Sequence, residues 1–186
     1  MKKLFWFLIL SVLLGSTVIS CKEEKENDTT ETSTGEGSLI FQKNEYQVPN
    51  FDLIKYDEYS DDDYLGLEMV FYTSDMKYDY GDNWHYGLGN AVRIDLISPS
   101  LNGLEPGIYN FDTTYSYSYG NGAVPNSIHW GNVQVGSELY EEELLCGTAE
   151  VSISEEIYTI KYSLIMESND TIAGTYKGEM NYISHR

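Results

Sequence analysis

Apolar and polar residues alternate with a period of two along much of the chain after residue 38. The clearest run places five side chains on one face: Tyr158, Ile160, Tyr162, Leu164 and Met166. Shorter runs of the same kind occupy 65–71, 92–96 and 149–153. Successive side chains of a strand point to opposite faces of a sheet, so this period predicts strands with one buried face. No comparably long stretch has helical periodicity, and we therefore predict an all-β domain.

Turn signals divide these runs into about eight to ten short strands, the last three forming a meander at 147–154, 157–166 and 171–182. Strands of this number, each with one polar face, fit an antiparallel β-sandwich or a closed, calycin-like β-barrel. We favour the sandwich, because the long acidic loops at irregular spacing suit it better than they suit an up-and-down barrel.

Glycines mark two special positions in these strands. Gly174 and Gly178 share the inward face of the last strand, where they leave room for large rings from facing strands. Near Gly131 the inward positions switch from even to odd residue numbers. Ile128 and Trp130 are inward before it, and Val133 and Val135 are inward after it. A phase change of this kind predicts a β-bulge.

The N-terminus has the layout of a bacterial export signal. Lys2 and Lys3 precede an apolar run at 4–14, which is shorter than the roughly 20 residues that a membrane-spanning helix needs. The segment Val18-Ile19-Ser20-Cys21 resembles the lipobox of bacterial lipoproteins. The resemblance implies that residues 1–20 are cleaved and that Cys21 receives a diacylglyceryl group. Two or more acyl chains anchor a protein stably in a membrane.

The residues after Cys21 indicate a destination and a domain plan. Lys22-Glu23-Glu24 resembles the export signal of Bacteroidota surface lipoproteins, which implies the outer face of the outer membrane; a solvated charge run has the same composition. Residues 22–38 contain no aliphatic or aromatic side chain, so we expect 21–38 to be a disordered acidic tether. Residues 39–186 then form a single β domain, a size that supports a core without a metal or a disulfide.

Charge and cysteine content narrow the function. Without residues 1–20 the chain has 9 basic and 30 acidic residues, a net charge near −21. Such a charge repels phosphate backbones and disfavours nucleic acid, whereas cations or basic partners are attracted. Because Cys21 takes the lipid, Cys146 has no intramolecular partner, and we expect it to be a small buried or half-buried thiol.

Aromatic residues suggest a ligand surface. Trp84 and Tyr86 lie in a stretch rich in Gly and Asp, and three further rings share one side if their segment is extended: Tyr115, Tyr117 and Tyr119. Exposed rings stack on sugar faces while nearby Asp and Asn side chains accept hydrogen bonds from hydroxyls. The alternative is that these rings cover the sheet, since Tyr suits half-buried strand positions.

Acidic residues suggest a second kind of site. Asp61, Asp62 and Asp63 offer the oxygen ligands that Ca²⁺ prefers, although their spacing is not that of an EF-hand loop, and a solvated acidic loop is the alternative. The histidines His85, His129 and His185 lack a metal-ligand spacing, and no phosphate loop or nucleophile elbow is present.

The sequence therefore predicts a non-enzymatic binding or structural lipoprotein of the outer membrane, exposed at the cell surface. Its expected partners are the membrane, through Cys21, and a glycan or a protein. The alternative is a secreted hydrolase or transport accessory whose site has no recognisable motif.

Overall fold

The computed structural model of the chain describes residues 35–61, 64–79, 84–112 and 124–184. These residues form fourteen strands and no helix, which confirms the all-β prediction with more strands than expected. In chain order the strands are β1 (Gly35–Phe41), β2 (Asn44–Gln47), β3 (Asn50–Asp61), β4 (Tyr64–Tyr72), β5 (Lys77–Asp79), β6 (Trp84–Tyr86), β7 (Asn90–Ser98), β8 (Gly107–Phe111), β9 (Ser127–Val135), β10 (Glu138–Tyr140), β11 (Leu144–Ser154), β12 (Ile157–Met166), β13 (Thr171–Gly178) and β14 (Asn181–Ser184). No described residue belongs to a helix long and apolar enough to cross a membrane.

One large sheet contains twelve of these strands, and β5 and β6 form a separate hairpin. The order across the large sheet is β14-β3-β4-β7-β9-β8-β11-β12-β13-β1-β2, with β10 paired to β9. The expectation of a purely antiparallel sheet is wrong, because β14 runs parallel to β3 and β8 runs parallel to β9. In both cases a crossover connection, and not a hairpin, brings the second strand to its neighbour.

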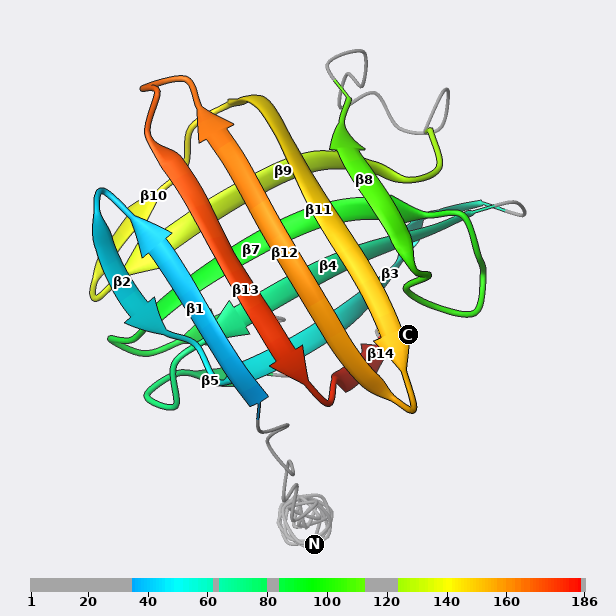
Figure 1. Cartoon of the computed structure of the whole chain (residues 1–186), viewed down its shortest axis with the longest axis horizontal. Coiled ribbons are helices and arrows are strands. Elements are labelled where there is room, and N and C mark those ends of the chain that lie inside the picture. Colours follow the sequence, from blue (N-terminus) through cyan, green and yellow to red (C-terminus); the bar gives the residue numbers. More distant parts are fainter. Residues whose placement is uncertain (1–34, 62–63, 80–83, 113–123, 185–186) are drawn as a thin grey trace, which may run out of the picture. The chain divides into compact units, whose positions relative to one another are not determined.

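The sheet curls over on itself, so that two groups of strands face each other (Figure 1). In Figure 1 the group β8-β11-β12-β13-β1-β2 lies in front of the group β14-β3-β4-β7-β9, and the strand directions of the two groups cross. Each group therefore has an inner face toward the other group and an outer face away from it.

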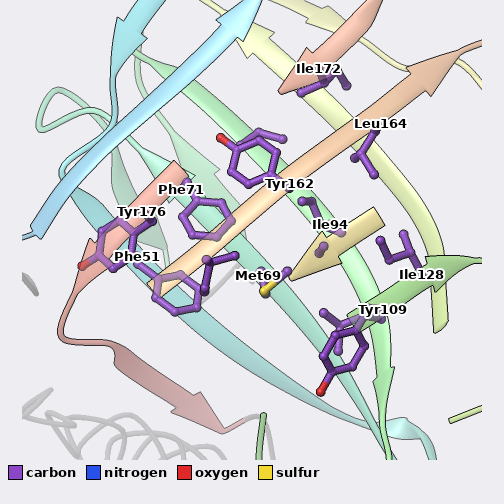
Figure 2. Packing of buried hydrophobic residues seen from close by; sticks show 14 of the residues in the cluster. Phe51, Met69, Phe71, Ile94, Tyr109, Ile128, Tyr162, Leu164, Ile172 and Tyr176 are labelled. Carbon is purple, nitrogen blue, oxygen red and sulfur yellow. The ribbon is translucent and has the colours of Figure 1, made fainter. Parts of the chain in front are cut away.

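Aromatic rings from both groups fill the space between the inner faces (Figure 2). Phe71 of β4 stacks on Phe51 at 4.7 Å and on Tyr162 of β12 at 5.1 Å between ring centroids. Tyr176 of β13 lies 5.2 Å from Phe51. The predicted inward set of β12 is confirmed, since its members are buried or, for Tyr158, half-buried, while the intervening Lys161 is exposed.

The two inward glycines of β13 make room for tyrosine rings, as predicted. The rings belong to the neighbouring strand and to β13 itself, and not to facing strands as expected. A Cβ atom on Gly174 would overlap the ring of Tyr162, which belongs to the neighbouring strand β12. A Cβ atom on Gly178 would lie 2.7 Å from the hydroxyl of Tyr176 on the same strand. Neither ring belongs to a facing strand.

The predicted bulge is present and lies at His129. Asp95 of β7 pairs with Trp130 of β9, whereas the next residue, Leu96, pairs with Ile128, so that His129 is the extra residue of the bulge. The prediction that Trp130 points inward is wrong, because Trp130 pairs with Asp95 and shares its outer face. The inward and outward positions of β9 therefore switch at His129, before Trp130, and not near Gly131 as the sequence pattern predicted.

Two features of the chain ends of this domain differ from expectation. β1 begins at Gly35, so four residues that the sequence analysis gave to the tether pair with β13. The last strand of the meander ends at Gly178 instead of 182, and the chain then crosses to β3 as β14.

Cys146 is exposed, and the expectation of a buried or half-buried thiol is wrong. The register of β11 against β12 shifts beside this residue and turns the thiol outward.

Candidate binding site on the outer face of the sheet

The outer faces of β3, β4, β7 and β9 hold charged and polar side chains that are buried. Asp52, Glu68, Arg93 and Asn132 are each at most 5% exposed, although their strand parity directs them away from the main core. The hairpin β5–β6 covers part of this face, and a small second apolar cluster lies beside it, formed by Ile54, Val70, Tyr72, Met76, Ala91 and Ile183. Buried charges are rare in proteins unless they are paired or hydrogen-bonded. We call Glu68, Arg93, Asp95 and Asn132 the outer-face cluster.

Asp52 connects the hairpin to the sheet. His85 Nε2 of β6 lies 2.8 Å from Asp52 Oδ2, and both side chains are 1% exposed. The hydroxyl of Tyr72 and the Nδ2 group of Asn181 each donate to Asp52 Oδ1 at 3.1 Å. Because a carboxylate only accepts hydrogen bonds, Asp52 holds donors from β4, β6 and β14 at once. The position of β6 on the sheet is thereby fixed.

Arg93 of β7 lies at the centre of the outer-face cluster. Its Nη2 group donates to the backbone oxygen of His85 at 3.2 Å, and its Nε lies 3.8 Å from Glu68 Oε1. Its guanidinium carbon lies 3.5 Å from the ring centroid of Trp84. A cation at this distance from an aromatic face is attracted by the ring quadrupole. Trp84 is thus held on one side by a buried cation while 40% of it remains exposed.

The carboxyl groups of the cluster repel one another. Glu68 and Asp95 are direct partners across the β4–β7 pair, a placement of like charges that destabilises a sheet. Loss of hydration and the neighbouring Glu68 hold the pKa of Asp95 well above its ordinary value, although Arg93 opposes this shift. The hydroxyl of Tyr56 donates to Glu68 Oε2 at 2.6 Å. Burial and that carboxylate raise the pKa of Tyr56. A carboxyl kept where its ionisation is costly is typical of functional sites.

Three buried polar atoms of this cluster have no hydrogen-bond partner within the described part of the chain. They are Arg93 Nη1, Asp95 Oδ1 and Asn132 Oδ1. Asn132 is the register partner of Arg93, and its Nδ2 group donates to Glu141 Oε1 at 3.4 Å. Most buried polar atoms in proteins are paired, so one unpaired donor and two unpaired acceptors in one cluster call for an explanation.

Trp84 and Trp130, the two tryptophans after residue 20, both belong to this face. Trp84 covers Arg93, and Trp130 is half-buried beside Asp95, its partner in the β7–β9 register. Tyr86 follows on β6 with an exposed fraction of 53%. The predicted ligand-binding residues Trp84 and Tyr86 are therefore both exposed on one strand, and the structure adds the buried Arg93 against Trp84.

The other predicted site residues are not brought to this face. Five predicted site residues and the predicted lipidation site Cys21 lie outside the described residues: Tyr115, Tyr117, Tyr119, Asp62 and Asp63. Asp61 ends β3, and its side chain is not described. No group of three His, Cys, Asp or Glu side chains in the described ranges has a geometry that could hold a metal ion.

Sequence reasoning missed Glu68, Arg93, Asp95, Asn132 and Trp130 as site residues. One signal was available, since Glu68 and Arg93 are charges inside otherwise apolar strands, in a chain with only 11 basic residues. The burial itself was not readable, because the hairpin that covers this face is a separate segment whose docking no local pattern encodes.

Two hollows elsewhere on the surface are lined by other residues. One of about 480 Å³ is an open depression lined by Gly35, Glu36, Ile157, Lys177 and Gly178. Another of about 250 Å³ lies between Leu53, Leu104, Tyr158 and Met180 at one end of the curled sheet. Neither is lined by a residue of the outer-face cluster.

The chain matches no protein-family model, no curated protein and no solved structure.

Proposed function

We propose that this chain is a lipid-anchored surface lipoprotein that acts as a non-enzymatic binding module and contacts its ligand through Trp84 and Tyr86. The observation that supports this most strongly is the position of Trp84. One side of the ring rests on the buried Arg93, and two-fifths of the side chain is open to solvent. A large aromatic side chain that is partly exposed beside a fixed polar group is typical of ligand sites.

The anchoring of the hairpin supports the same role. Besides the contact between His85 and Asp52, Gln134 Nε2 donates to the backbone oxygens of Gly87 and Gly136, both at 2.9 Å. These bonds tie β6 to β9 on one side and to β3 on the other. Pre-organised contact residues on rigid elements favour recognition of a partner.

The hydrolase alternative has less support. The His85–Asp52 pair has the chemistry of an acid–base dyad, but each side chain is only 1% exposed. A general acid or base must come within hydrogen-bond reach of the substrate. Glu68 is 5% exposed, and its carboxylate already accepts a hydrogen bond from the half-buried Tyr56. We therefore assign these groups to the support of the binding surface.

The finer description of the fold and the cellular location belong to the same proposal. Within the described residues the sheet is an open path whose end strands, β14 and β2, are not neighbours, which favours a sandwich over a closed barrel. The lipobox at Cys21 and the following Lys22-Glu23-Glu24 favour attachment to the outer membrane and exposure at the cell surface.

A glycan array tests the proposal, with binding measured in the presence and in the absence of Ca²⁺. The probe is the chain 21–186 with Cys21→Ser, which removes the acyl chains and leaves every described residue in place. The double variant Trp84→Ala/Tyr86→Ala is expected to lose at least nine-tenths of the signal. Tyr182→Ala is the matched control, because Tyr182 is 44% exposed on β14 and should be dispensable. Equal binding by the double variant and the control would contradict the assignment of the surface.

A further inference from the structure

We propose that Trp84 covers a subsite for one uncharged sugar ring, whose hydroxyl groups bond Arg93, Asp95 and Asn132. The inference rests on the proposed binding function and specifies the class of ligand. Its starting point is the set of three unpartnered atoms: the donor Arg93 Nη1 and the acceptors Asp95 Oδ1 and Asn132 Oδ1. Arg93 and Asn132 are both at least 99% buried, so water does not satisfy these atoms from the bulk.

The donor and acceptor balance fits a pair of neighbouring hydroxyl groups. Each hydroxyl donates one hydrogen bond and accepts others. Two hydroxyls on adjacent carbons therefore supply the two donors that Asp95 and Asn132 lack and the acceptor that Arg93 lacks. A carboxylate ligand would satisfy only Arg93, and an ammonium ligand would satisfy only the two acceptors.

The aromatic residues fit the other surface of a sugar. Trp84 lies over Arg93, and Trp130 is the register partner of Asp95 on the outer face, so each of these two polar residues has an indole ring beside it. Ligand sites commonly join apolar and aromatic walls to a few placed polar groups. The C–H face of a pyranose packs on an indole ring while its hydroxyl edge points to the polar group.

Charge limits the ligand to uncharged sugars. Glu68, Asp95 and Glu141 all interact electrostatically with Arg93, which is the one cation among these four residues. A uronic acid, a sialic acid or a phosphate placed here would meet more negative than positive charge. The chain as a whole has a formal net charge of −19, which adds to this discrimination.

Entry requires Trp84 to leave the guanidinium of Arg93. Trp84 is the first residue of β6 and is two-fifths exposed, so its side chain can rotate outward without breaking a strand pair further along the hairpin. When the indole leaves the cation and contacts a sugar, its magnetic environment changes, and the resonance of its N–H group shifts. This provides a readout that reports on the subsite itself.

Nuclear magnetic resonance of the two indole N–H groups gives the test. The chain 21–186 with Cys21→Ser has only Trp84 and Trp130, and Trp130→Phe assigns the signals. The probes are the neutral hexasaccharides of cellulose, laminarin, mannan and xylan, with hexagalacturonic acid as the charged counterpart. We expect at least one neutral probe to shift the Trp84 signal, and hexagalacturonic acid to leave it in place. Failure of all four neutral probes, or equal binding of the acid, overturns the inference.

Variants of the polar atoms complete the test. Asn132→Leu keeps the volume of the side chain but removes its unpaired acceptor, and it should raise the Kd of the neutral probe at least tenfold. Asp95→Asn weakens the second acceptor and serves where Asn132→Leu does not fold. If Trp84→Ala/Tyr86→Ala abolishes array binding but neither polar variant weakens it, the subsite is wrong and the proposed binding surface stands. If the double variant also binds normally, the proposed function itself fails.

Discussion

Asp95, Arg93 and Asn132 show how far a residue's environment can depart from its strand pattern. Alternation places Arg93 and Asp95 at polar positions of a strand, and their faces were predicted correctly. Their burial was not, since a polar position is read as solvent-facing unless another segment covers it. Cys146 is the reverse case, because a register shift beside it exposes a thiol that was expected to be buried.

His129 gives a prediction at this scale. Burial lowers its pKa to about 4, against the opposing effect of Asp112, whereas an unfolded histidine titrates near 6.5. Between these values the unfolded chain binds a proton that the folded chain does not, so this residue lowers stability as the pH falls from about 6.5 to about 4. His129→Gln should remove about 1 kcal/mol of the loss measured by urea unfolding between pH 7.5 and pH 5, after allowance for partial exposure. Identical losses in the variant and the parent would show that His129 titrates normally.

At the scale of strands, the sequence was most informative where neighbours in the chain are also neighbours in the sheet. The meander β11-β12-β13 and the inward set of β12 follow from alternation and short polar links. The parallel pairs β14–β3 and β8–β9 were not predictable, because they join segments that no hairpin connects. The position of the hairpin β5–β6 on the outer face depends on the same kind of distant contact, through Asp52 and His85.

Tyr162 and Ser163 test the register of β12. Tyr162 stacks on Phe71 and its hydroxyl donates to the backbone oxygen of Ser38 at 3.2 Å, whereas Ser163 is exposed. Tyr162→Ala should lower the free energy of unfolding by about 3–5 kcal/mol, the usual loss for a buried aromatic side chain. Ser163→Ala should change it by no more than about 0.5 kcal/mol in urea melts. Similar losses in the two variants would mean that the faces of β12 are assigned wrongly.

At the scale of the whole molecule, the proposed membrane attachment is separate from the fold and rests on the N-terminal sequence alone. The lipobox resemblance predicts that the acyl chains are attached to Cys21. Cys21→Ser should therefore abolish incorporation of labelled palmitate and move the protein from the detergent phase to the aqueous phase after phase separation. Retention of the variant in the detergent phase would contradict lipid anchoring through Cys21.

Ligand binding by the outer-face cluster is the central claim at this scale, and Asp95→Asn measures it most directly. A structural role and a binding role both predict a more stable variant, because the Asp95 carboxyl is costly to ionise in the folded chain, and they differ in the ligand affinity that they predict. The substitution should raise the free energy of unfolding at pH 7, and the gain should shrink as the pH falls through the raised pKa of Asp95 toward 3.8. The exposed Glu150 of β11 provides the control, Glu150→Gln, which removes the same charge from the opposite group of strands.

The deciding measurement is the stability of Asp95→Asn together with its affinity for the neutral oligosaccharide that binds the parent chain. A more stable variant that binds at least fivefold more weakly, beside an unchanged Glu150→Gln, is the expected result for a carboxyl that accepts hydrogen bonds from a ligand. A variant that gains stability and binds as tightly as the parent would show that the cluster is a buried structural group and that the ligand contacts another surface.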